Sequence, residues 1–279
     1  MPKSNKSIFY KYIVLIFVCS SMIGIVLLYA TNIPAIMETF ARVEGAFIGV
    51  PIILVRIAIM SSMTFYMFNR WFAQEEQFLD DIPFLFAVFL LVLTYGKAID
   101  LFGNLTFFTL EEEFVLLILK VRFFLLIVDL IPMIFLSIGM ILFSLSYRNK
   151  FKKLQNESYL NRIRERIIFF IVSIEIIVLL MAPDITTISL LYPIVAIPSL
   201  ITIVWLFNFA YKHKKLSQVN PFILTVGFGA LLASQIFRPL MQLIIGTTAY
   251  FIILVEIIDL IVFGIIFVGF YMKANYSVE

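Results

Sequence analysis

Nine ionisable or amide side chains interrupt long apolar stretches of this sequence, and their chemistry is the first feature to explain. They are Arg56, Lys97, Asp100, Asp129, Glu175, Gln235, Arg238, Glu256 and Asp259. Charged groups in apolar surroundings are costly, so they face a bundle interior, a water-filled cavity or one another. This set therefore contains the candidate ligand-binding residues.

The apolar stretches predict a polytopic membrane protein. Of the 279 residues, 62% are hydrophobic and 14% are charged, whereas a soluble domain is about half apolar and about one quarter charged. Eight stretches are long enough to cross a bilayer. They are 9–30, 46–68, 82–102, 122–147, 166–183, 188–210, 221–242 and 249–272. The expected fold is an all-α bundle of eight transmembrane helices.

Two of these stretches carry special features. Pro193 and Pro198 predict a kink or partial unwinding in the sixth stretch, because proline removes a backbone donor. Lysines precede the first stretch, as they do in a signal peptide. However, this stretch is long for a signal sequence and no clear cleavage motif follows it, so we expect it to be retained.

The basic residues predict the orientation. Fifteen of the 21 lysines and arginines lie on the side of the N-terminus, and only Arg42 lies in the opposite loops. Those opposite loops carry acidic residues such as Glu38 and the triplet 111–113. Because basic loops stay in the cytoplasm, we expect a multi-pass protein of the cell membrane with both termini cytoplasmic. Both termini share a side only if the number of spans is even.

The sequence also contains an apparent internal repeat. The matching segments follow one another in the same order, and they are 25–33 with 177–185, Pro51 with Pro193, 83–100 with 221–238, and 128–131 with 258–261. The expected organisation is a first four-span repeat over 1–147, a basic cytoplasmic linker over 148–165 and a second four-span repeat over 166–279. Four spans in each repeat give parallel repeats, related by an axis along the membrane normal.

The polar residues are expected to form a layer. At about 1.5 Å per helical residue, most of them lie towards the outer side of the membrane, and Glu175 lies near its midplane. Two interpretations remain open. One is an outward-facing pocket for a small polar solute or ion. The other is a set of ion pairs between helices, of which Asp100 with Arg238 is the first expected pair. Lys120 and Arg122 are expected at the interface, where long cationic side chains reach water.

These patterns favour a transporter of a small polar solute or ion, with Glu175 as a candidate coupling group. The alternative is a receptor-like sensor or a scaffold subunit of a membrane complex without transport activity. The basic linker is then a candidate surface for a protein partner or anionic lipid, although a solvated loop is the simpler explanation.

Enzyme chemistry has no support in the sequence. It contains no pair of histidine and carboxylate, no cluster with metal-ligand spacing and no glycine-rich phosphate loop. Cys19 is the single cysteine, and His213, the single histidine, lies among lysines. We therefore expect no enzymatic activity and no cofactor, and nothing indicates nucleic-acid binding.

Overall fold

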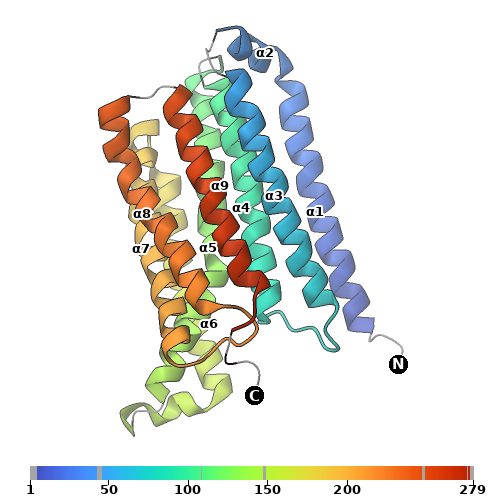
Figure 1. The fold of residues 1–279 in the computed structure, drawn as a ribbon, viewed down its shortest axis with the longest axis vertical. Coiled ribbons are helices and arrows are strands. Elements are labelled where there is room, and N and C mark those ends of the chain that lie inside the picture. The colour runs from blue at the N-terminus through green and yellow to red at the C-terminus, as the bar shows by residue number, and fades with distance from the viewer. Residues whose placement is uncertain are drawn as a thin grey trace. The chain divides into compact units, whose positions relative to one another are not determined.

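The computed structural model describes residues 5–42, 46–107, 109–146, 149–246, 249–274 and 276. This part of the chain is helical and contains no strand (Figure 1). Its elements are α1 (Asn5–Thr31), α2 (Ile33–Arg42), α3 (Ala46–Phe72), α4 (Ile82–Thr106), α5 (Glu112–Ser146), the 3-10 helix η1 (Asn149–Gln155), α6 (Glu157–Met181), α7 (Ile185–Lys212), α8 (Pro221–Ile245) and α9 (Ala249–Tyr271).

Among the described residues, seven helices are long and apolar enough to cross a membrane, namely α1, α3, α4, α5, α7, α8 and α9. The chain is therefore an all-helical, multi-pass integral membrane protein in contact with the lipid bilayer. The remaining predicted span, 166–183, falls in α6, which does not meet the same criterion. Its apolar run begins only after Arg166 and contains Glu175.

Two predicted boundaries and one predicted loop are wrong. Helix α5 begins at Glu112, so Arg122 lies inside the helix and not at its start. The polar segment expected to be a loop is largely helical, because α6 begins at Glu157. The Asn156 side chain caps this helix by accepting a hydrogen bond from the Tyr159 N–H at 3.2 Å. Glu157 adds a favourable negative charge to the first turn.

Helix α7 is continuous through Pro193 and Pro198, so the expected partial unwinding does not occur. It starts with a side-chain cap, in which the Asp184 carboxylate accepts a hydrogen bond from the Thr187 N–H at 2.7 Å. This hydrogen bond holds the pKa of Asp184 below its usual range, because it favours the charged form. The Asp184 side chain therefore satisfies one of the free backbone N–H groups at the start of α7.

Helix α2 is a short amphipathic helix that the sequence did not predict. Ile36 and Phe40 pack against a cluster of Ile53, Leu101 and Leu105 from α3 and α4. Glu38 and Arg42 form an exposed ion pair at 2.6 Å on the same helix. With one apolar face and one charged face, α2 has the character of an interfacial helix.

The chain forms two compact units, residues 1–125 and 126–279, and it passes from one to the other within α5. In the first unit, α3 packs along α4, and α1 and α2 also contact α4 (Figure 1). In the second unit, α8 packs along both α7 and α9.

Candidate functional site

The nine predicted residues lie on six helices. They are Arg56 on α3, Lys97 and Asp100 on α4, Asp129 on α5, Glu175 on α6, Gln235 and Arg238 on α8, and Glu256 and Asp259 on α9. More than nine tenths of the surface is buried for Arg56, Lys97, Asp129, Glu256 and Asp259. Such burial of charged groups is unusual and requires counter-charges or hydrogen bonds nearby.

In the first unit, Asp100 pairs with a residue that the sequence placed at the membrane interface. The Nε of Arg122 donates a hydrogen bond to Oδ1 of Asp100 at 2.7 Å. The arginine side chain is 10% exposed and the aspartate side chain is 32% exposed. The cation is thus the buried member of this pair, and the carboxylate keeps access to its surroundings.

Gly96 makes room for this pair. It lies one helical turn before Asp100 on α4, so both residues share a face. A Cβ at Gly96 would lie 3.1 Å from Nη1 and 3.2 Å from Cζ of Arg122. The guanidinium therefore lies directly against the α4 backbone, and a side chain at position 96 would require it to shift by a few tenths of an ångström.

In the second unit, a similar pair has the opposite arrangement of signs. The Nη2 of Arg238 on α8 donates to Oδ1 of Asp259 on α9. Here the arginine side chain is 27% exposed and the aspartate side chain is 1% exposed. The Ser234 hydroxyl lies one turn before Arg238, at 3.4 Å from its Nε. The buried member of this pair is the anion.

Glu256 and Asp259 share one face of α9, as their spacing predicts. The same buried face continues through Phe263, Ile266 and Phe270. Its acidic residues are therefore confined to the first half of the helix, and its second half is apolar.

The apolar half of α9 is packed closely against α8. A Cβ at Gly227 would lie 2.7 Å from Cγ1 of Ile266, and one at Gly269 would lie 2.8 Å from Leu224. The Asn220 N–H also donates to the Gly269 carbonyl at 2.8 Å. Small residues allow such close approach of helices in membranes. The α8–α9 hairpin is thus fixed at one end by glycine packing and towards the other by an ion pair.

Asp100 and Arg238, the first expected pair, each have a counter-charge within their own unit. Asp100 has Arg122 as its counter-charge, and Arg238 has Asp259. Sequence reasoning missed Arg122 because the predicted span began at that residue. The available signal was the Glu112-Glu113 start of a helix, since acidic residues favour a helix N-terminus.

Glu175 differs from the other acids. It is partly buried on α6, and no hydrogen bond or ion pair to its carboxylate is found in the described part of the chain. The same residues contain no group of three or more metal-ligating side chains.

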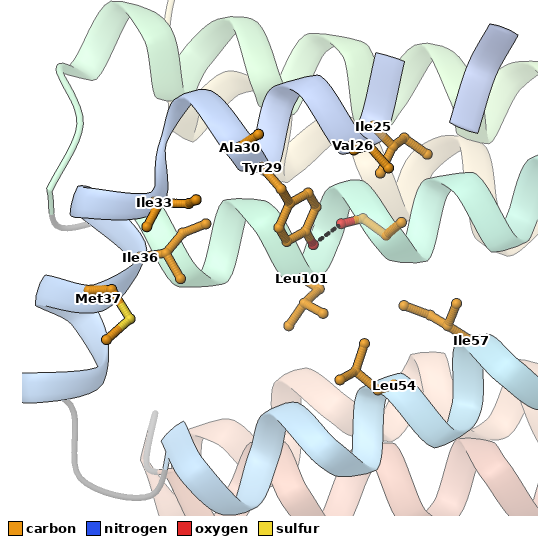
Figure 2. Close-up of a pocket in the computed structure, with 11 residues that line it drawn as sticks. Ile25, Val26, Tyr29, Ala30, Ile33, Ile36, Met37, Leu54, Ile57 and Leu101 are labelled. Atoms are coloured by element: carbon orange, nitrogen blue, oxygen red, sulfur yellow. Dashed lines mark hydrogen bonds between the residues drawn. The ribbon is translucent and has the colours of Figure 1, made fainter. Parts of the chain in front are cut away.

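Two adjoining apolar cavities lie in the first unit between α1 and α3. Their volumes are about 670 Å³ and about 580 Å³. Figure 2 shows that the second cavity is bordered by side chains of α1, α2, α3 and α4. None of the nine predicted residues lines either cavity. These cavities are thus distinct from the charged residues.

Comparisons with protein-family models, with curated proteins and with solved structures find no match to this chain.

Proposed function

We propose that this protein transports a small polar solute or ion, and that the charged side chains within its spans form the binding layer. The observation that carries the proposal is the burial of five charged residues together with an ion pair in each unit. Buried ion pairs contribute little net stability compared with apolar packing. Their presence in a membrane protein therefore favours a role in binding or moving charge.

The proposed topology has eight spans with cytoplasmic termini. Helix α6 supplies the eighth span, because its 25 residues extend over about 37 Å. The basic residues at its start, such as Arg162 and Arg166, would reach the interface while the apolar run enters the bilayer. With this span, the basic segment before α6 and the basic segment after α7 both lie on the cytoplasmic side of the membrane.

The proposed repeat explains the positions of the two ion pairs. In the gap-free match of 83–100 with 221–238, Asp100 aligns with Arg238 and Gly96 aligns with Ser234. Each aligned charge forms a pair with the next long helix of its own unit. A duplicated four-helix unit followed by exchange of charge signs accounts for this correspondence.

In the proposed transport cycle, a charged group of the solute competes with an ion-pair partner. Asp100 and Arg238 are the more exposed members of their pairs. Each can therefore release its internal partner and bind a solute group of opposite charge. Glu175 takes up or releases the coupled proton or ion.

The test is transport into liposomes that contain the purified protein and a trapped pH-sensitive dye. Inorganic ions, amino acids and sugars are added in turn under an imposed pH gradient, and proton movement is recorded. Glu175→Gln should reduce solute-dependent proton flux at least tenfold, because it removes the charge and keeps the shape. Glu165→Gln, at an exposed position of the same helix, should leave it unchanged. Unaltered flux in folded Glu175→Gln protein would rule out the coupling role.

The alternative is a sensor or scaffold subunit. The two apolar cavities and the exposed surface of α1 favour it, because they offer contact area for another molecule in the membrane. A stable complex with a second protein through purification, combined with no flux in liposomes, would support this alternative over transport.

A further inference from the structure

Helix α1 is joined to the rest of the first unit mainly through α4. The Tyr29 hydroxyl donates to the Ala98 carbonyl at 2.8 Å, and the Tyr95 hydroxyl donates to the Val18 carbonyl at 3.2 Å. These two bonds fix α1 against one side of α4, while α3 packs along α4 as well. A space between α1 and α3 is left, with α4 as its floor.

This space contains the two adjoining cavities. Both cavities are bordered by Ile25, Val26, Ile57 and Ala98. Figure 2 shows α1, α2, α3 and α4 around the smaller cavity, with the hydrogen bond from Tyr29 to α4 on one side. The larger cavity extends from there along α1 to Lys11. The cavities together form a groove along most of the length of α1.

The charged side chain that lines the larger cavity lies at one end. Thr64 and Thr94 donate their hydroxyls to carbonyls of their own helices at 2.9 Å and 2.7 Å. Both hydroxyl protons are therefore used within the helix and are not available to a bound molecule. Lys11 and Asn69 lie at the end near the start of α1. The Lys11 ammonium lies 5.0 Å from the centre of the Phe72 ring.

The length of this cavity matches one leaflet of a bilayer. From Lys11 to Val26 the helix rises about 22 Å. One leaflet contributes about 15 Å of hydrocarbon, and a head group lies beyond it. A cavity with a long apolar part and a single cationic end has the shape and charge of a site for one anionic phospholipid.

We propose that the larger cavity binds an anionic phospholipid of the cytoplasmic leaflet, with an acyl chain between α1 and α3 and its phosphate at Lys11. The cationic end complements the phosphate, and basic sites between membrane helices on the cytoplasmic side bind such head groups. The proposal rests on the proposed cytoplasmic position of the N-terminus and is independent of transport.

The experiment measures lipid retained by the purified chain after equilibration in nanodiscs of equal parts phosphatidylglycerol and phosphatidylcholine. Native mass spectrometry then counts each lipid bound to the protein. Wild type should retain phosphatidylglycerol about fivefold over phosphatidylcholine, the factor that about 1 kcal/mol per basic side chain represents. Lys11→Gln should remove this preference, and Lys11→Arg should keep it.

Two further variants locate the site. Lys212→Gln, at an exposed basic position in the second unit, should behave as wild type. Ala98→Phe places a ring where the two cavities meet and should reduce total retained lipid of both kinds. Equal retention of both lipids by wild type, or an unchanged preference in Lys11→Gln, would overturn the proposal. So would a photo-crosslinker at Met22 that traps a polypeptide and no lipid.

Discussion

Each unit contains one arginine–aspartate pair between two consecutive long helices, and the order of the two charges along the chain is reversed between the units. In the first unit the aspartate is on α4 and the arginine is on α5, and in the second unit the arginine is on α8 and the aspartate is on α9. The buried member also changes, since Arg122 is 10% exposed in one pair and Asp259 is 1% exposed in the other. In both pairs the more exposed member is the residue on the first helix.

This difference matters because the two buried ions are not equivalent. A guanidinium stays protonated under all ordinary conditions, whereas a carboxyl group can be neutralised by taking up a proton. Loss of the counter-charge therefore leaves a permanent cation in the first unit. In the second unit it leaves a carboxyl group, which can be neutralised in acid. The loss of the first pair should therefore be independent of pH, and the loss of the second should depend on it.

The largest expected effect is therefore that of Asp100→Leu. This change leaves the Arg122 guanidinium without its carboxylate partner and should lower the free energy of unfolding by about 3 kcal/mol. Arg238→Leu should cost about as much at pH 7, because neutralising a carboxyl group there itself costs about 4 kcal/mol, and its cost should fall when the pH is lowered to 5. Both values come from unfolding in a mixed-micelle denaturant titration at the two pH values.

The double variant Asp100→Leu with Arg122→Leu is the matched control. Replacing both members of a buried pair by apolar residues is often close to neutral, so this variant should recover most of the loss. If the costs of Arg238→Leu and Asp100→Leu change equally between pH 7 and pH 5, the distinction between the two buried ions is wrong.

The sequence predicted the membrane class and most helices because both follow from local composition. Long apolar runs define α3, α4, α8 and α9 almost independently of their neighbours. The start of α5 was missed because Lys120 and Arg122 resemble an interface when α5 is considered alone. The burial of Arg122 depends on Asp100 and Gly96, which belong to another helix. Helix α2 was missed because its apolar face is short and becomes evident only against Leu101 and Leu105.

The candidate residues could be named from the sequence because a charge is visible in any apolar stretch, but their partners could not. The partner of each charge depends on which helix lies beside it and at what height. Asp100 and Arg238 were expected to meet because they align in the repeat, yet alignment describes equivalence and does not imply contact. Each pairs instead with the helix that follows it in the chain.

A smaller effect is expected at Gly96, where the first pair rests against the α4 backbone. Gly96→Ala would force the Arg122 guanidinium to move by a few tenths of an ångström, and it should destabilise the protein by about 1 kcal/mol. Gly103→Ala is the matched control on α4, because its Cβ would meet Ile118 at an ordinary 3.7 Å. That control should be neutral or slightly stabilising, since alanine favours a helix. Thermal unfolding of the two variants gives the comparison, and equal shifts would contradict it.

The smallest effect is expected at Ser234, the position that aligns with Gly96. Its hydroxyl accepts long hydrogen bonds from Arg238 at 3.4 Å and 3.5 Å, which are at the limit of the accepted geometry. Arg238 keeps its main partner in Asp259, so Ser234→Ala should change stability by less than about 0.5 kcal/mol, as typical membrane hydrogen bonds suggest. A loss as large as that of Gly96→Ala would mean that the serine holds the guanidinium in place. The second pair would then depend on its small neighbour as strictly as the first does, and the contrast between the units would lie in sign alone.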